Sequence, residues 1–180
     1  WIALTPEQRE RTAIFTAGRD DRNQINRLVQ DELRKEGVLS GEGHATRVLQ
    51  STNNTREEMR FPATYREGQV LDARMGVREL RLERGQYTVK DTTADGKVIL
   101  IDKEGRERII DPQRIDSQHR YDRLSLNDTK DITLHTGDTI FWRDKDKENG
   151  IDKSTYAKIL SADKDNVTIE LADKRQVTLP

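Results

Sequence analysis

The chain has 180 residues, of which 32 are basic and 33 are acidic, so its formal net charge is −1. Charged residues make up 36% of the sequence and hydrophobic residues 32%, a composition that predicts small cores beneath a heavily charged surface. The balance of charges excludes an overall basic field, so any nucleic-acid site must be a local patch.

The sequence has no cysteine, no membrane-spanning apolar run and no signal peptide, and these absences exclude several classes of protein. Cysteine is absent, which excludes disulfides, thiolate metal sites and thiol catalysis and suits a cytoplasmic protein. No apolar run approaches the roughly 20 residues of a membrane helix, and no signal peptide is visible. Because the chain starts at Trp1 rather than Met and stops inside a strand-like run at Pro180, we expect it to be a piece of a larger protein.

The N-terminal segment has the pattern of an α/β element. Thr5–Gln8 predicts a helix start, with Thr5 as the cap and Gln8 at the capping-box position. The apolar run Thr12–Thr16 predicts a short strand that is buried on both faces. A second helix follows, capped by Asp20 or Asp21 and ended by Gly37. This order is typical of the edge of a parallel sheet, although one strand cannot form that sheet alone.

The hydrophobic period changes from helical to strand-like beyond this element. Thr46–Gln50 predicts a strand, and Thr55–Glu58 is a capping box that opens one helical turn, which should end before Pro62. From Tyr65 onward the period is two, and Gln69–Arg74 begins the first of two predicted barrels.

The same small β unit occurs twice in the rest of the chain, once within Gly85–Pro112 and once within Ser154–Pro180. Each copy reads as three short strands joined by tight turns, as in a small curled barrel. The residues that we match between the copies are Tyr87 with Tyr156, Val98 with Val167, and Pro112 with Pro180.

The second copy follows a polar connector at Arg114–Asn127. Ile132–Arg143 opens the second barrel with a turn at Gly137-Asp138, and Asn149-Gly150 is a strong turn signal in the charged loop that follows. We therefore predict an α+β chain, in which a partial α/β element precedes two tandem small β-barrels. The predicted domains are residues 1–62, 63–120 and 121–180.

The sequence contains no recognisable catalytic motif. His44, His119 and His135 lie on separate segments without metal-ligand spacing, so we predict neither a metal site nor catalytic residues. Neither a phosphate-binding G-x-x-x-x-G-K-[ST] loop nor a G-x-S-x-G nucleophile elbow occurs.

The segment Phe141–Gly150 is the strongest candidate for a binding site. An aromatic residue that leads into Arg143, Lys145 and Lys147 suits single-stranded nucleic acid, because bases stack on aromatic rings and cations meet phosphates. The alternative is that Trp142 or Phe141 is a core residue and the loop is only solvated. Strand alternation lets just one of the two rings point inward.

A second candidate lies where the predicted strand meets the second helix. Arg19 and Arg22 lie near the start of that helix, where phosphates are often bound. A solvated helix cap accounts equally well for both arginines.

Taken together, these residues resemble the conjugative relaxase–helicases of the TraI and TrwC type, in superfamily 1. Leu4–Asn26 resembles their motif IV region, which belongs to the second RecA-like (2A) subdomain. Gly137–Ile151 resembles the hairpin that opens their inserted 2B barrel, although Asp144 and Asp152-Lys153 replace some family residues. The two barrels correspond to the paired 2B and 2B-like modules, which are SH3-like.

The resemblance implies a non-catalytic part of a larger motor protein. The ATP-binding motifs of the family lie upstream of such a segment and motifs V and VI lie downstream, so ATP and Mg²⁺ would be cofactors of the parent protein alone. The implied partners are single-stranded DNA and the coupling protein of type IV secretion, which reads a translocation signal. The segment should be monomeric, make no membrane contact, and act in the bacterial cytoplasm before export to a recipient cell.

The residues that we expect to contact DNA are Trp142, Arg143, Lys145, Lys147, Lys153, Arg19 and Arg22. The rival hypothesis is a protein-interaction module that the coupling protein recognises and that has no affinity for DNA. The near-neutral charge favours this rival, whereas the aromatic-basic loop favours DNA.

Overall fold

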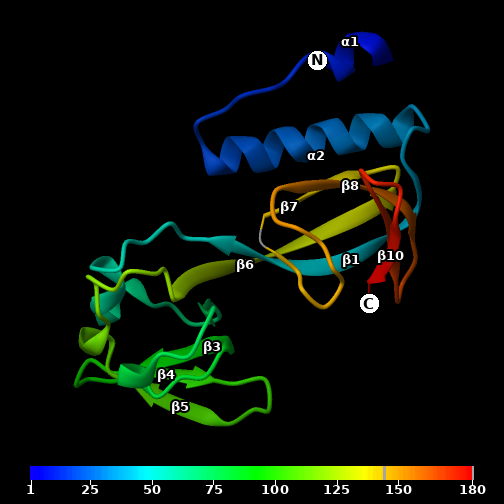
Figure 1. Cartoon of the computed structure of the whole chain (residues 1–180). Coiled ribbons are helices and arrows are strands. Elements are labelled where there is room, and N and C mark those ends of the chain that lie inside the picture. Colours follow the sequence, from blue (N-terminus) through cyan, green and yellow to red (C-terminus); the bar gives the residue numbers. More distant parts are fainter. Residues whose placement is uncertain (144, 180) are drawn as a thin grey trace. The chain divides into compact units, whose positions relative to one another are not determined.

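The computed structural model describes residues 1–143 and 145–179, with Arg19 described by its backbone alone (Figure 1). The chain divides into two compact units. Unit 1 comprises Trp1–Thr46 with Thr133–Pro180, and unit 2 comprises Arg47–Ile132. No helix of the described residues is long and apolar enough to cross a membrane.

Two strands carry the chain across the boundary between the units. The chain leaves unit 1 within β1 (Ser40–Ser51) and returns within β6 (Leu124–Thr136). Unit 1 is therefore built from both ends of the sequence, and unit 2 from one continuous stretch. The predicted domain boundaries after residues 62 and 120 remain a prediction. They divide the chain into three consecutive stretches, whereas unit 1 combines both ends of the sequence.

The start of the first helix and the C-terminus of the second helix of unit 1 are as their sequences predict. Helix α1 (Pro6–Glu10) has the expected capping box, in which Thr5 and Gln8 each accept a hydrogen bond from the other's backbone N–H. Helix α2 (Arg19–Lys35) ends in a Schellman motif, in which Gly37 has φ +73° and its N–H donates to the Arg34 carbonyl.

The predicted caps of α2, Asp20 and Asp21, are wrong. The N-cap is Gly18, and no side chain caps the helix. Both aspartates lie in the first turn instead, where their negative charges interact favourably with the positive end of the helix dipole.

The predicted buried strand at Thr12–Thr16 is also wrong. The segment has no strand structure, and Phe15 is 91% exposed and Ile14 44% exposed. Strand structure requires a neighbour that pairs with the backbone, and neither sheet of the described residues contains such a neighbour for this segment. The described residues therefore contain no parallel α/β layer.

Beyond α2 the regular structure is mainly antiparallel sheet. One sheet has the strand order β1-β6-β2-β3-β4-β5, and a second has the order β10-β9-β8-β7. The strands not yet given are β2 (Val70–Ala73), β3 (Gly85–Thr92), β4 (Val98–Ile101), β5 (Glu107–Ile110), β7 (Thr139–Trp142), β8 (Thr155–Ala162), β9 (Val167–Leu171) and β10 (Gln176–Leu179). Single 3₁₀ turns occur at η1 (Glu58–Arg60), η2 (Pro62–Thr64), η3 (Arg78–Leu80) and η4 (Pro112–Arg114).

The internal duplication is confirmed at the level of topology. The meander β2-β3-β4-β5 of unit 2 and the meander β7-β8-β9-β10 of unit 1 connect four antiparallel strands in the same order. Each has a register shift at the same place in its second strand, between Val89 and Asp91 in β3 and between Ile159 and Ser161 in β8. Each meander lies within the range predicted for one barrel.

A glycine begins each meander in the same way. Gly68 (φ +82°) donates its N–H to the Val89 carbonyl at 2.9 Å, and Gly137 (φ +98°) donates to the Ile159 carbonyl at 2.8 Å. A positive φ costs glycine little, which explains why both turns carry this residue. These hydrogen bonds fix the register of the first strand against the second.

The matched residues of the two copies are right at one position and wrong at another. Val98 and Val167 begin β4 and β9 and are both buried, as predicted. Tyr87 is buried, whereas Tyr156 is 64% exposed, and the buried counterpart of Tyr87 is Ala157. Compared with the first copy, the second copy has one additional residue before β8 and one residue fewer in the hairpin between β8 and β9. Residues within β8 are therefore shifted by one position relative to β3, and the two copies are in step again from β9 onward. The match of Pro112 with Pro180 falls outside the described residues.

Each unit buries its own core. In unit 2, Leu71, Leu100 and Leu126 are fully or almost fully buried. Tyr65 closes this core and donates its hydroxyl to the Met59 carbonyl at 2.7 Å, and burial raises the pKa of Tyr65. The core of unit 1 is smaller and consists of Ile151, Ala157, Ile159, Val167, Ile169 and Leu171.

The two glycines provide a matched test of the turn geometry. We expect Gly137→Ala to destabilise the chain more than Gly68→Ala. Both substitutions place a Cβ at positive φ, at a cost of about 1–2 kcal/mol, but a Cβ at Gly137 would also lie 2.8 Å from the Val38 carbonyl oxygen, whereas one at Gly68 meets nothing within 4 Å. Urea unfolding followed by circular dichroism measures both, and equal losses of stability would contradict the clash.

Candidate nucleic-acid interface

The charged loop after β7 has a defined shape. Asp146 and Ile151 exchange two backbone hydrogen bonds of 2.8 Å, which close the loop as an isolated bridge. The Asp146 carboxylate accepts hydrogen bonds from the Asn149 side chain and from two backbone N–H groups, and these bonds lower the pKa of Asp146. Gly150 has φ +64°, so the predicted Asn149-Gly150 turn is confirmed. The turn between Asp146 and Ile151, which carries Lys147, therefore has a defined geometry.

The two aromatic residues at the end of β7 point to opposite sides of the sheet. Trp142 is half-buried and packs against the core of unit 1, whereas Phe141 is 47% exposed. The structure thus resolves the alternative that strand alternation left open, and the inward ring is Trp142. Trp142, the one aromatic residue among those predicted to contact DNA, therefore packs against the core instead of offering its ring face to a base.

The outward aromatic residue has a partner that sequence reasoning does not connect with it. Phe141 lies opposite Tyr156 in the β7–β8 register, and their ring centroids are 4.8 Å apart at an interplanar angle of 47°. The two residues are far apart in the sequence, and the alignment of the two copies pairs Tyr156 with the buried Tyr87 instead. Only knowledge of the strand register could have joined them.

The predicted basic residues of this region are exposed. Lys145 forms an ion pair of 2.8 Å with Asp152, which lowers the pKa of Asp152, but both side chains are more than half exposed, so the pair contributes little stability. Among the described residues, no hydrogen bond or ion pair involves Arg143, Lys147 or Lys153. These three cations are available to a phosphate.

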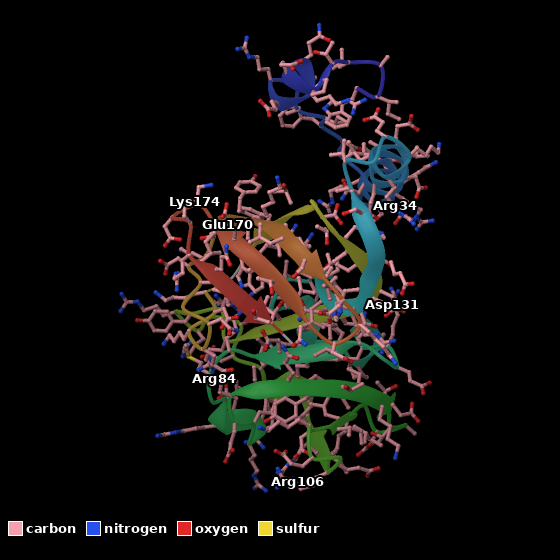
Figure 2. All side chains as sticks on the ribbon, turned by 90° about the vertical axis from the view of Figure 1, so that its right-hand side faces the viewer. Arg34, Arg84, Arg106, Asp131, Glu170 and Lys174 are labelled. Atoms are coloured by element: carbon pink, nitrogen blue, oxygen red, sulfur yellow. The ribbon has the colours of Figure 1, made fainter. Side chains whose placement is uncertain are left out.

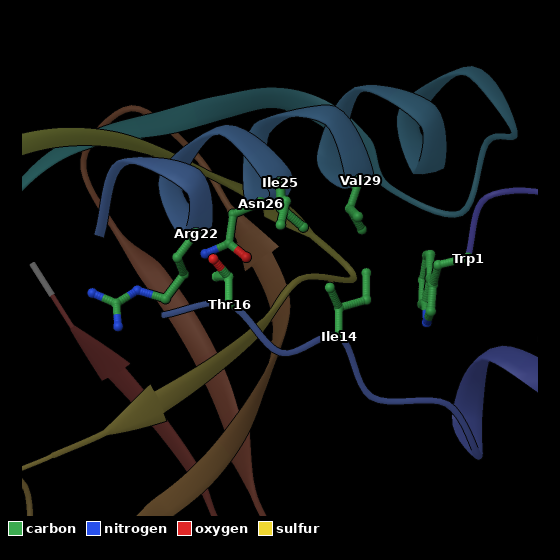
Figure 3. Close-up of a pocket in the computed structure, with 7 residues that line it drawn as sticks. All are labelled: Trp1, Ile14, Thr16, Arg22, Ile25, Asn26 and Val29. Carbon is green, nitrogen blue, oxygen red and sulfur yellow. The ribbon is translucent and has the colours of Figure 1, made fainter. Parts of the chain in front are cut away.

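The second predicted site, at Arg19 and Arg22, has no hydrogen bond or ion pair to this loop among the described residues. Unit 1 contains a cavity of about 270 Å³, and among its described lining residues Arg22 of α2 is the charged one (Figure 3). The other lining residues are Trp1, Ile14, Thr16, Ile25, Asn26 and Val29. No hydrogen bond or ion pair of the described residues joins Arg22 to the loop after β7. The Arg19 side chain lies outside the described part of the structure.

The three histidines lie in separate places in the structure. His44 is buried and its Nδ1 lies 2.6 Å from the Asp163 carbonyl oxygen, and His135 is also buried. His119 is half-buried beside Tyr121. The described residues contain no group of three or more histidine or acidic side chains that could hold a metal ion.

The inward position of Trp142 gives a test that separates folding from binding. We expect Trp142→Ala to lower the free energy of unfolding by about 2 kcal/mol, roughly half the loss for a fully buried tryptophan, and to leave the binding of single-stranded DNA by the folded protein unchanged. Unfolding by circular dichroism and fluorescence anisotropy with a labelled oligonucleotide give the two readouts. Weakened binding without a loss of stability would place the ring in a DNA site after all.

Comparison with known proteins agrees with this architecture. Residues 48–134 match the family model of the DNA relaxase TraI 2B/2B-like domain, a range close to unit 2. The multifunctional conjugation protein TraI of Escherichia coli is 28% identical over 180 residues, which cover 100% of this chain and 10% of the relative.

A second relative, the multifunctional conjugation protein TraI of Escherichia coli strain K12, is 29% identical over 172 residues, which cover 94% of this chain and 9% of the relative. The chain thus spans about a tenth of the length of these relatives and aligns with both almost from end to end. Residues 48–134 thus match the 2B/2B-like domain family of the DNA relaxase TraI, and the chain as a whole is similar to a segment of the TraI-type conjugation proteins.

Proposed function

We propose that this chain is a non-catalytic segment of a conjugative relaxase–helicase that holds single-stranded DNA. In this proposal the two meanders are SH3-like modules of the 2B and 2B-like kind, and the N-terminal helices belong to an incomplete 2A element. The observation that carries the proposal is the match of residues 48–134 to the 2B/2B-like family, within a chain related to TraI over its whole length. The duplicated meander extends the same topology to the C-terminal part of the chain.

The chemistry of the loop after β7 supports contact with DNA. Lys147 lies within the closed turn between Asp146 and Ile151, Arg143 and Lys153 lie on either side of that turn, and an exposed aromatic residue, Phe141, precedes them. Such a patch can neutralise a few phosphates, and its local character agrees with the near-neutral charge of the whole chain.

Secretion recognition is the second part of the proposal. The relatives are named as conjugation proteins, and in our proposal this segment carries a translocation signal that the coupling protein of type IV secretion reads before export to the recipient cell. The proposed form of the segment is a monomer without membrane contact, and ATP and Mg²⁺ are left to other parts of the parent protein.

The alternative function is a protein-interaction module with no affinity for DNA. The closely balanced charges favour this alternative, because a strongly bound polyanion usually meets an excess of cations. The two functions differ in one measurable property, the affinity for single-stranded DNA.

We expect the purified chain to bind a short oligo-deoxythymidine with an affinity that falls as salt rises. The double substitution Arg143→Ala/Lys147→Ala should flatten the slope of log affinity against log salt by about 0.7 for each phosphate that the variant no longer neutralises. A charge-matched control is Lys35→Ala/Lys103→Ala, since both lysines are exposed and lie away from the loop in sequence. Fluorescence anisotropy from low to physiological salt makes the measurement, and equal slopes in the two variants would remove the loop from the DNA site.

We also expect the isolated chain not to hydrolyse ATP, with or without DNA, because it contains no phosphate-binding loop motif. A coupled assay for ADP release on a nuclease-free sample tests this expectation. Turnover above the background of a heat-denatured sample would contradict it.

A further inference from the structure

An exposed aromatic pair lies on the outer face of the β7–β8 hairpin. Phe141 and Tyr156 are direct neighbours across the two strands, with ring centroids 4.8 Å apart, and they are 47% and 64% exposed. Large rings usually lie in cores or interfaces, because burial of their surface is favourable. Two touching rings that both keep about half of their surface in water are a candidate contact surface.

The other copy of the meander shows that the fold does not require these rings. Asp72 and Gln86 occupy the same register positions in β2 and β3 as Phe141 and Tyr156 do in β7 and β8. The same four-stranded topology therefore forms with an acid and an amide at this place. The aromatic pair distinguishes the second meander from the first by chemistry, not by architecture.

A basic residue follows each ring of the pair by two positions. Lys158 follows Tyr156 by two residues in β8 and is exposed, so it lies on the same face, and Arg143 follows Phe141 by two residues. The acid opposite Lys158 is Glu170, which already pairs with Lys174 at 3.0 Å (Figure 2). The aromatic pair thus has one cation two residues further along β8 and another directly after the end of β7, and the neighbouring acid has its own partner.

Rings flanked by cations on an open sheet face suit one ligand class above others. Single-stranded nucleic acids offer unpaired base faces for stacking and phosphates at regular spacing, whereas duplex DNA hides its base faces. An acidic peptide would satisfy the cations but would leave the two ring faces without a matching planar group.

We propose that Phe141 and Tyr156 form a base-stacking platform for single-stranded DNA, with phosphates near Lys158 and Arg143. This inference rests on the proposed function and specifies its site: the outer face of β7–β8, rather than Trp142 or the corresponding face of the first meander. Since every base has a stacking face, the platform should bind with little sequence preference.

The test compares Phe141→Leu/Tyr156→Leu with the unaltered chain. Leucine keeps an apolar side chain but removes the ring, and each ring removed should weaken binding of an oligo-deoxythymidine by about 5- to 150-fold. The matched control is Phe61→Leu/Tyr121→Leu, because these aromatic residues of unit 2 are 63% and 51% exposed. Anisotropy gives the affinities, circular dichroism verifies folding, and a duplex of the same length tests strand preference.

A second measurement does not depend on any variant. An oligonucleotide that contains 5-iodo-deoxyuridine is cross-linked to the unaltered chain by long-wavelength ultraviolet light, and mass spectrometry locates the modified residue. We expect cross-links at Phe141 or Tyr156. Cross-links confined to residues outside β7 and β8 would overturn the platform even if the double variant failed to fold.

The outcomes separate this inference from the proposed function. If the unaltered chain does not bind single-stranded DNA at low salt, both fail and the protein-interaction module takes their place. If it binds, and the double variant and the control bind equally well, the platform is wrong while the proposed function stands. Equal affinity for duplex and single strands would also overturn the platform, because stacking needs free base faces.

Discussion

The register of β7 against β8 is the constraint on which the proposed site depends. Side chains alternate between the two faces of a strand, so a slip of one residue would exchange every inward and outward position. The hydrogen bond from Gly137 to the Ile159 carbonyl and the pairing of Phe141 with Tyr156 hold this register. Trp142 consequently packs against the core, and the ring that faces solvent is Phe141. The same constraint places Lys158 beside Tyr156 on the outer face.

Local signals in the sequence predicted local structure well. The capping box at Thr5, the helix end at Gly37 and the turn at Asn149-Gly150 each depend on neighbouring residues, and the structure has all three. The strands of both meanders also follow from period-two patterns between turn residues. Even so, the copies could not be aligned residue by residue, because an inserted residue and a deleted residue lie between the shared turns and shift only part of the second copy.

Features that depend on distant partners were harder to predict. The run Thr12–Thr16 has the composition of a buried strand, but composition cannot supply a neighbouring strand, and Phe15 is left almost fully exposed. In the candidate site, the sequence identified the basic residues and the presence of an aromatic, yet the pairing of Phe141 with Tyr156 crosses two strands. Tertiary register, not residue preference, decides such contacts.

The interleaving of the two units has a consequence for synthesis of the chain. Unit 2 is one continuous stretch, Arg47–Ile132, whereas unit 1 combines the first residues with Thr133–Pro180. A ribosome therefore delivers all of unit 2 before the second half of unit 1 exists, and domains generally fold as they emerge. The early residues of unit 1 cannot complete their packing until Thr133–Pro180 has been synthesised. Unit 2 is thus expected to fold first and to bring the two halves of unit 1 into the same neighbourhood, which shortens the chain search that completes it.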